Sequence, residues 1–571
     1  MTSAEFSAYL ETIEQTASRN RMTELLAELF RAASAEEIGK ICYLLQGRVA
    51  PLYEALEFGV AEKFIMRAIT RAYKVEQKVV VEEFKRRGDI GKAAEALHAG
   101  RAKPLRVSGL YAKLRDVAMA SGQGSQEQKI TILADLLARV DAKTARFIAR
   151  IPLDKLRLGF SEMTILDALS WMLAGDKSYR KKLEEAYDVR PDIGFIAETV
   201  KKDGMSGLSH VRAKVGSPVL AQLCQRLPTA DEMIKKMGEV DVEPKYDGVR
   251  VQIHYDRGSV KTYSRNLENT TPMFPELSDA GKQIHAESVV LDCEAVGVDP
   301  KTGKIVSFQE TTTRKRKHGI EGAQKSVPLK FFVFDILLKN GKDLLDVPLS
   351  DRRTILEKTV HKGQLLVVSP HIITSEATVL RDYHDEQLKA GLEGAVVKKW
   401  NSPYEPGRRG YSWVKFKEEE GKAGKLTDTI DAVVMGYYVG EGKRTGFGIG
   451  AFLVGVRKKE LYVTVTKVGT GVSDELWKDL KRELQKIRVA NPPKEYAGVS
   501  KLLVPDIWVA PKVVVEIAGD DLTKSPNHGA GYAVRFPRLV RIRTDKGIGD
   551  ITTEEEIARM YRNQSAVRHA S

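Results

Sequence analysis

The spacing of apolar residues changes once along the chain, at Gly216-Ser217-Pro218. Before this point leucine and phenylalanine recur at helical spacing, as at Leu25, Leu26, Leu29 and Phe30. After it, apolar and polar residues alternate over residues 249–255, which is the pattern of a half-buried strand. The helical spacing and the strand alternation require different secondary structures. We therefore predict an all-helical first domain over residues 1–215, followed by a domain that contains a sheet.

The second region alternates strand and helix signals. Strands are predicted at 249–255, 260–264, 289–296, 330–338 and 394–399, and a helix is predicted at 350–360. The first two strands are joined by Asp256-Arg257-Gly258, which is typical of a hairpin turn. This order predicts a mixed α/β domain over residues 216–420.

A charged stretch with glycines and few apolar residues, 418–425, predicts a linker. The chain beyond it is rich in strand signals, with one helix near 474–487 and a closing helix at 553–564. Strands are predicted at 432–438, 451–456, 461–468 and 513–517. We predict a small β-barrel of the OB type over residues 421–571, and such barrels commonly bind nucleic acid.

The formal net charge of +14 favours a polyanionic partner. Nucleic acid fits better than a membrane, because the sequence has no long apolar span. Basic residues gather in the helical region at Arg146, Arg150, Lys155 and Arg157, and in a loop at 314–318. Together with the small, polar loop at 121–126, they are candidates for contacts with phosphates, and a solvated charged surface is the plain alternative.

Cys42, Cys224 and Cys293 lie far apart in the sequence and form no CxxC pair. This spacing argues against a disulfide framework and against a zinc module. The ten histidines show no metal-binding spacing, so any catalytic metal is expected to be a hard cation such as Mg²⁺. The first fifteen residues are typical of neither a signal peptide nor a transit peptide, and a cytoplasmic location is expected.

Lys245 opens the segment Lys245-Tyr246-Asp247-Gly248-Val249-Arg250. A lysine just before a tight turn and a strand can act as a nucleophile toward a nucleotide phosphate, but its ordinary pKa of about 10.4 makes the free amine cost roughly 4.6 kcal/mol at neutral pH. Such a site needs other cations nearby. The chain offers five that could lower the lysine pKa and hold a triphosphate: Arg265, Lys398, Arg409, Lys415 and Lys417. A surface Lys-Asp pair beside a hairpin is the plain alternative.

Arg250 lies five residues after Lys245, in the predicted strand. Successive side chains of a strand point to opposite faces. If Val249 and Val251 belong to the core, Arg250 therefore points toward the face that is available to a ligand.

Five further clusters follow Lys245 in order: Ser264-Arg265-Asn266, Asp292-Cys293-Glu294, Phe334-Asp335, Glu393 to Lys398, and Trp413 to Lys417. Their order and spacing resemble the ATP-dependent DNA ligases of the covalent nucleotidyltransferase superfamily. Two late segments, Arg535 to Arg538 and Arg543 to Lys546, resemble the last motif of this family. The helical region, with Arg157-Leu158-Gly159, is similar to the DNA-binding domain of archaeal and eukaryotic replicative members. The resemblance covers nearly the whole chain.

The resemblance implies a role for each matching residue. Lys245 would attack the α-phosphorus of ATP and carry AMP, Glu243 would accept a hydrogen bond from the adenine amine, and Phe334 would stack on the base. The other ATP contacts would come from Arg250, Arg265, Glu294, Arg409 and Lys415, with Lys417 as a further candidate. Glu294 and Glu393 would hold Mg²⁺ or Mn²⁺. Taken singly, Glu294 could be a salt-bridged strand residue, Phe334 a core residue, and Lys415 with Lys417 a solvated strand face.

The resemblance also implies the reaction and the partners. AMP would pass from Lys245 to the 5′-phosphate of a nick in duplex DNA, and the 3′-hydroxyl would then displace AMP, in replication, repair and recombination. Arg538, Arg543 and Lys546 would orient pyrophosphate, and the linker would let the barrel swing toward the DNA. The helical domain would close around the duplex, and the protein would act as a monomer.

Relatives of this type often bind a sliding clamp through a segment that begins with Gln and ends in paired aromatic residues. The nearest region, Leu105 to Leu110, lacks both features. Three other classes of protein are alternatives. RNA capping guanylyltransferases use GTP and lack a large helical domain, NAD-dependent ligases carry a four-cysteine zinc module, and a nucleic-acid-binding scaffold would form no covalent nucleotide adduct.

Overall fold

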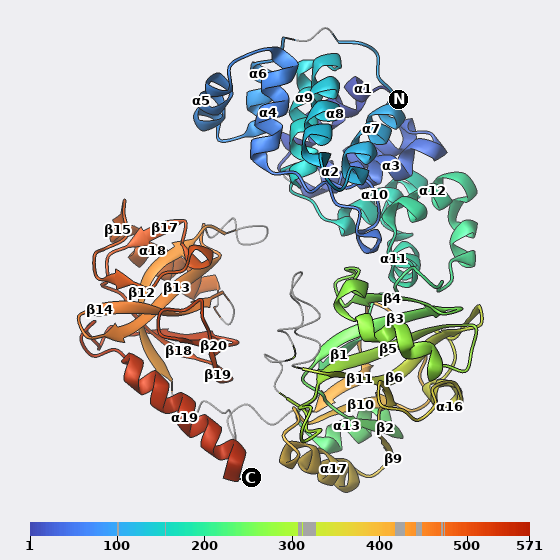
Figure 1. Cartoon of the computed structure of the whole chain (residues 1–571), viewed down its shortest axis with the longest axis vertical. Coiled ribbons are helices and arrows are strands. Elements are labelled where there is room, and N and C mark those ends of the chain that lie inside the picture. The colour runs from blue at the N-terminus through green and yellow to red at the C-terminus, as the bar shows by residue number, and fades with distance from the viewer. Residues whose placement is uncertain are drawn as a thin grey trace. The chain divides into compact units, whose positions relative to one another are not determined.

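The structure is a computed structural model that describes residues 1–99, 102–154, 156–306, 311, 327–416, 429–440, 448–469, 472 and 474–570, without the side chains of Arg409, Asp474 and residues 564–570. The predicted linker at 418–425, the basic loop at 314–318, Lys155 and Lys417 lie outside the described residues. The chain forms two compact units (Figure 1). One consists of residues 1–383 and 395–415, and the other of residues 384–394 and 416–571.

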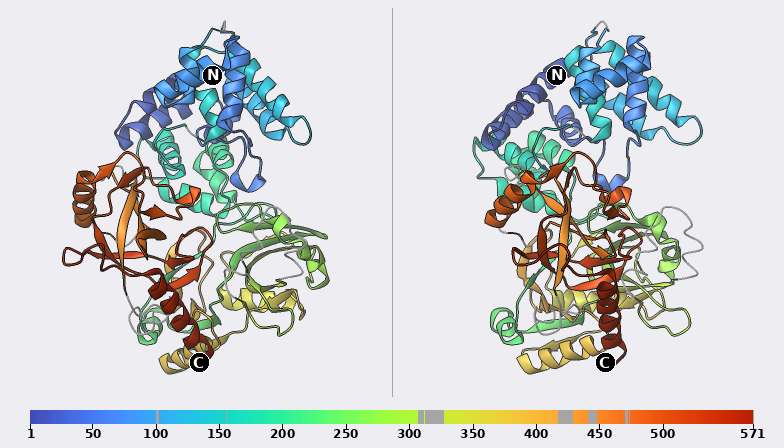
Figure 2. Two further views of the ribbon diagram at one scale, coloured as in Figure 1. Left: turned by 60° about the vertical axis from the view of Figure 1, so that its left-hand side comes forward. Right: turned by 90° about the vertical axis from the view of Figure 1, so that its left-hand side faces the viewer.

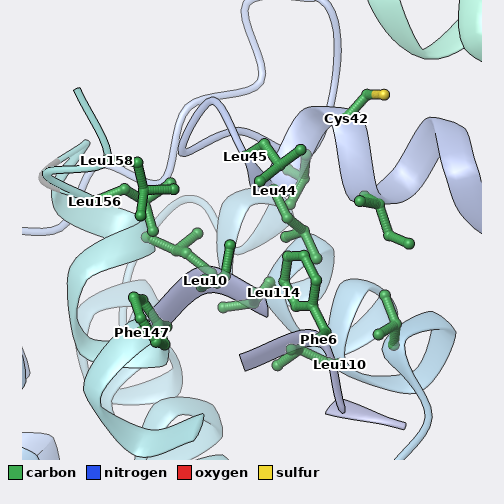
Figure 3. Close-up of a cluster of buried hydrophobic side chains, with 14 of the residues drawn as sticks. Phe6, Leu10, Cys42, Leu44, Leu45, Leu110, Leu114, Phe147, Leu156 and Leu158 are labelled. Carbon is green, nitrogen blue, oxygen red and sulfur yellow. The ribbon is translucent and has the colours of Figure 1, made fainter. Parts of the chain in front are cut away.

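The first part of the first unit is helical, as predicted. Its helices are α1 (Ser3–Glu14), α2 (Arg19–Ala32), α3 (Ala35–Leu44), α4 (Glu62–Tyr73), α5 (Gln77–Arg87), α6 (Ile90–Ala96), α7 (Val107–Met119), α8 (Ser125–Arg139), α9 (Ala142–Arg150), α10 (Glu162–Ala174), α11 (Arg180–Val189) and α12 (Ile193–Asp203). Helix α1 begins after Thr2, which forms a capping box with Glu5. Phe6 and Leu10 of α1 gather with Phe147 of α9 in one apolar cluster (Figure 3).

Two arginines that we expected to face phosphates are buried instead. The Arg150 side chain is 1% exposed and donates hydrogen bonds to Asp89 and Glu14. Arg146, 9% exposed, pairs with Glu11 and Glu14. A desolvated guanidinium must be paired to be tolerated, so these residues join α9 to its neighbours in the helical core. For Arg146 and Arg150 the expected phosphate contact was wrong.

The rest of the first unit contains two sheets. One has the order β4-β3-β5-β6-β7 with β8 beside β6, and the other has the order β1-β11-β10-β2-β9. The strands are β1 (Leu223–Arg226), β2 (Val240–Pro244), β3 (Val249–Asp256), β4 (Ser259–Ser264), β5 (Ser288–Gly297), β6 (Leu329–Lys339), β7 (Lys342–Asp343), β8 (Leu366–Val368), β9 (Ile372–Thr374), β10 (Ala395–Lys399) and β11 (Arg409–Phe416). The helices of this part are α13 (Ala230–Met237), α16 (Leu349–Thr359) and α17 (Ala377–Lys389), the last of which runs on into the second unit. The predicted strands and the predicted helix at 350–360 are confirmed to within about two residues.

The two sheets explain how the segment that follows β2 is placed. β2 and β3 are consecutive in the chain but belong to different sheets. Residues 245–248 therefore cross from one sheet to the other. Apolar residues of both sheets flank this crossing in the chain and are fully buried: Val240 and Val242 of β2 and Val251 of β3.

The second unit is rich in β-structure. Its strands are β12 (Ile430–Tyr438), β13 (Ala451–Lys458), β14 (Leu461–Val468), β15 (Arg488–Val489), β16 (Tyr496–Ala497), β17 (Ile507–Val509), β18 (Val514–Ala518), β19 (Asp521–Lys524), β20 (Tyr532–Arg535) and β21 (Arg538–Ile542). The main sheet has the order β15-β17-β12-β13-β14-β16, and β18 pairs with β12 and β21. Trp477 of α18 (Asp474–Lys486) packs edge-on against Phe452 in the core. Helix α19 (Glu554–Ala570) closes the chain, as both views of Figure 2 show, and is longer than predicted.

The four longer strands and both helices of this unit were predicted, and the short strands were not. None of the helices in the described part of the chain combines the length and the apolar composition that a membrane crossing requires.

Candidate active site

Lys245 lies at the start of the crossing between the two sheets, directly after β2. The crossing ends at Gly248, where a Cβ atom would come within 2.4 Å of the carbonyl oxygen of Ala295 on β5. Only glycine allows the backbone to approach β5 so closely. The Lys-x-Asp-Gly segment is therefore held against β5, beside Glu294.

Several cations converge around this crossing. Burial raises the pKa of the Cys224 thiol on β1, and the positive charges of Arg250, Lys245, Lys398 and Lys415 oppose that rise. Two of the five predicted cations, Lys398 and Lys415, thus lie close enough to act on the same side chain as Lys245 and Arg250. Positive surroundings of this kind favour the free amine that a lysine nucleophile requires.

Arg250 is fixed by a buried hydrogen-bond network. Its Nε and Nη2 atoms donate to the two oxygens of Asp292 at 3.1 and 2.6 Å, and Nη1 donates to the carbonyl oxygen of Gln222 at 2.7 Å. Tyr404 donates to the same Asp292 carboxylate at 2.8 Å. Asp292 therefore orients Arg250, which lies on the face of β3 opposite Val249 and Val251, as predicted.

Phe334 lies beside these cations on β6. Its ring is partly exposed, whereas the flanking Val333 and Asp335 are buried. The Arg250 guanidinium and the Lys398 ammonium lie 5.4 and 4.8 Å from the ring centroid. Phe334 is therefore partly buried and lies beside two cations, rather than being fully enclosed in the core.

Glu243 is buried at the end of β2. Its Oε1 atom accepts hydrogen bonds from Lys398 Nζ at 2.8 Å and from Arg353 Nη1 at 3.1 Å. Lys398 is 1% exposed and also donates to the carbonyl oxygen of Phe334. We expected Lys398 among the cations that hold a triphosphate, and the structure pairs it with Glu243 instead. Sequence reasoning missed Arg353, because nothing in its local sequence marks it.

The other predicted residues are spread more widely. Arg265 is exposed and lines a cavity of about 650 Å³ together with Arg157 and Gly159 of the helical region. Lys415 is half-buried on β11. The side chain of Arg409 and all of Lys417 lie outside the described residues. Glu393 belongs to the second unit, and the described residues contain no preformed group of three or more His, Cys, Asp or Glu side chains that could hold a metal.

The last-motif residues of the second unit are all ion-paired. Arg538 pairs with Asp520 at 2.8 Å. Arg543 and Lys546 both pair with Asp431, at 3.0 and 2.5 Å. Arg538 keeps 37% of its side chain exposed, whereas the Arg543 side chain is 11% exposed.

Comparisons with known proteins identify the family. The sequence matches three family descriptions: "DNA ligase N terminus" over residues 2–170, "ATP dependent DNA ligase domain" over 218–417, and "ATP dependent DNA ligase C terminal region" over 445–546. The chain belongs to the ATP-dependent DNA ligase family. The predicted membership and the predicted ligase activity are thereby confirmed: the protein is an enzyme that uses ATP to seal nicks in DNA.

Individual relatives match over the full length of this ligase. A "Probable DNA ligase" of Dictyoglomus turgidum is 40% identical, and the alignment covers 98% of this chain and 97% of the relative. A "DNA ligase" of Pyrobaculum calidifontis is 38% identical over 99% of each chain. A solved structure described as "Pmar-Lig_Pre." has a TM-score of 0.56 at 17% identity, covering 95% of this chain and 99% of that chain, and shows likeness of fold.

Glu294, which lies beside the Lys-x-Asp-Gly segment, gives this ligase a testable pH dependence of stability. Burial raises its pKa to about 7, although Lys245 and Arg250 oppose the shift. The folded pKa lies above the ordinary 4.5, so the stability contributed by the protonated form is complete below about pH 4.5 and is lost as the pH rises through about 7. We expect wild type to lose about 1–3 kcal/mol relative to Glu294→Gln between pH 5 and pH 8.

Apparent melting temperatures of the two nucleotide-free proteins at both pH values measure this difference. Glu287→Gln is the matched control, because Glu287 is 71% exposed and should follow wild type. If the melting temperatures of wild type and Glu294→Gln changed equally between the two pH values, the raised pKa of Glu294 would be contradicted.

Proposed function

We propose that Lys245 is the nucleophile of this ligase and that the crossing between the two sheets is its nucleotide pocket. The Lys245 amine attacks the α-phosphorus of ATP, a P–N bond forms, and pyrophosphate leaves. The 5′-phosphate of the nick then takes AMP from Lys245 and frees the amine. Finally the 3′-hydroxyl attacks the adenylated phosphate, forms the phosphodiester bond and releases AMP. Each step is a displacement at phosphorus, so alignment and charge neutralisation supply most of the catalysis.

The placement of Lys245 at the crossing between the two sheets, where Gly248 packs against Ala295 and Glu294 of β5, is the observation that carries this proposal. The charges of Arg250, Lys398 and Lys415 act with that of Lys245 on the neighbouring Cys224. In the pocket we assign Glu243 to the adenine amine and Phe334 to the face of the base. The phosphate and ribose contacts are assigned to Arg250, Arg265, Glu294, Arg409 and Lys415, with Lys417 as a further candidate. Lys398 acts through Glu243, to which it donates.

We assign a role as a carboxylate ligand of Mg²⁺ or Mn²⁺ to Glu294 and, independently, to Glu393. Glu294 fits a hard cation, because its carboxylate oxygens are of the type that Mg²⁺ prefers and it lies near the reactive lysine. Bound there, the metal would neutralise phosphate charge in the displacement. Mg²⁺ takes most of its ligands from phosphates and water, which agrees with a site of few carboxylates.

The partner is nicked duplex DNA, bound in the cytoplasm by a monomer. The cavity that joins Arg265 to Arg157 and Gly159 supports a duplex path between the helical region and β4, since exposed arginines and backbone amides position phosphates. The second unit is proposed to be an OB-type barrel that brings Arg538, Arg543 and Lys546 toward pyrophosphate. Of these, Arg538 is the most exposed, whereas Arg543 and Lys546 would have to exchange Asp431 for the ligand.

A sliding clamp would need a surface other than residues 105–107. Ser3 N donates to the carbonyl oxygen of Leu105, and Val107 N donates to that of Met1. This segment is therefore held along the N-terminus, and it also lacks the sequence that relatives use.

Replacing Phe334 tests the pocket. In Phe334→Ala we expect the KM for ATP in covalent adenylation to rise roughly 5- to 150-fold, because stacking of a base on an aromatic ring contributes about 1–3 kcal/mol. Phe334→Trp, which keeps a flat face, should stay near wild type. The rate of adduct formation from α-labelled ATP is measured against ATP concentration, with and without MgCl₂. An unchanged KM in Phe334→Ala would refute the proposed stacking of Phe334 on the base. An adduct formed equally well without divalent metal would refute the proposed role of the metal in adenylation.

A further inference from the structure

The carboxylate of Glu243 is held from one side only. Lys398 and Arg353 both donate to Oε1, and among the described residues no donor reaches Oε2. Burial and the charge of Asp241 raise the pKa of Glu243, and direct contact with Lys398 and Arg353 opposes that rise. The second oxygen is thus available to accept a hydrogen bond from a ligand.

His371, which precedes β9, contacts two carboxylates near Glu243. Its Nδ1 atom lies 2.6 Å from Oδ1 of Asp241, a fully buried residue of β2. Its Nε2 atom lies 3.6 Å from Oε1 of Glu357 on α16. That same Glu357 oxygen accepts a hydrogen bond from Nε of Arg353 at 3.0 Å.

These contacts close into a ring. From Glu243 it runs through Arg353 and Glu357 to His371 and Asp241. It returns through Lys398, because Lys398 of β10 is the direct strand partner of Asp241 and donates to Glu243.

Two carboxylates of the ring lie against the imidazole of His371, those of Asp241 and Glu357. Burial would raise the pKa of Asp241, but the hydrogen bond from His371 and the charge of Lys398 bring it below its ordinary value. The other oxygen of Asp241, Oδ2, is buried without a hydrogen-bond partner among the described residues. Asp241 therefore depends on His371 and Lys398 for its compensation.

We infer that His371 is a positioning residue for recognition of the adenine amine. Without the imidazole, Asp241 would be a buried carboxylate whose nearest remaining cation is Lys398. Lys398 would then be drawn from Glu243 toward Asp241, and the free oxygen of Glu243 would lose its fixed direction. This inference rests on the proposed role of Glu243, and it adds a residue that never touches the nucleotide.

Two nucleotides separate a positioning role from a general structural one. Purine riboside triphosphate lacks the exocyclic amine of ATP and is otherwise the same. In His371→Ala we expect the KM for ATP in adenylation to rise about tenfold and the KM for the amine-free analogue to stay unchanged, because only ATP loses a hydrogen bond. Sealing of a nick that is already adenylated should keep its rate. His371→Gln, whose amide can still donate to Asp241, should recover part of the preference for ATP.

Two further variants make the outcome decisive. His361→Ala replaces an exposed histidine outside the ring and should behave as wild type. Glu243→Gln should itself abolish the preference for ATP. If His371→Ala changes both nucleotides equally, or neither, while Glu243→Gln removes the preference, only the role of His371 is overturned. If Glu243→Gln keeps the preference, the assignment of Glu243 fails and the inference fails with it.

Discussion

Lys245→Ala will form no covalent adenylate from ATP and will still seal a nick whose 5′-phosphate already carries AMP. The substitution removes the attacking amine of the first step, whereas the last step uses the 3′-hydroxyl of the DNA. We expect adenylation to fall by on the order of 10³-fold or more, as is usual when a covalent nucleophile is removed. Mass spectrometry of the ATP-treated chain measures the adduct, and a pre-adenylated nicked duplex measures the last step.

Two variants separate the nucleophile from its charge. Lys245→Arg keeps a cation in the pocket and should be as inactive in adenylation as Lys245→Ala, because a guanidinium is always protonated in proteins. Lys261→Ala removes an exposed lysine of the neighbouring hairpin and should leave both steps unchanged. An adduct on another side chain, or a full adduct in Lys245→Arg, would refute the assignment of Lys245.

The sequence was informative where the signal is local. The alternation of Val249, Val251 and Ile253 predicted a strand, which β3 confirms, although Gln252 and His254 on its other face are buried as well. The position of Lys245 followed from a short segment with a turn and a glycine that the backbone requires. Such patterns are readable because the chain neighbours themselves fix the geometry.

The sequence was less informative where the partner comes from a distant segment. Lys398 is paired with Glu243 across 155 residues, and Arg353 reaches the same carboxylate across 110. Which strands become neighbours decides these pairs, and sheet order is not written in local periodicity. The same reason applies to Arg150, whose partners are Glu14 at the end of α1 and Asp89, the N-cap of α6. A cluster of cations in the sequence therefore predicted a positive pocket, but not which cations remain open to a ligand.

The largest effect on stability is expected at Asp335, the residue that follows Phe334. Its carboxylate and the guanidinium of Arg352 are both fully buried and meet in two hydrogen bonds of 2.8 Å. Removing one partner leaves an uncompensated charge in the core, so Arg352→Met should lower the free energy of unfolding by about 3–5 kcal/mol. The pair also anchors α16, on which the adjacent Arg353 reaches Glu243. We therefore expect a higher KM for ATP together with the lost stability.

A double substitution distinguishes the buried charge from lost packing. Arg352→Met combined with Asp335→Leu removes both charges, and it should recover much of the stability that Arg352→Met alone loses. Urea unfolding, with amide hydrogen exchange in β6 and α16, measures both variants. Glu287→Gln breaks an exposed pair of similar length with Arg257 and should cost no more than about 0.5 kcal/mol. If Arg352→Met costs as little as this control, or if the double variant is less stable by the sum of its single effects, the buried charge does not determine the stability of this region.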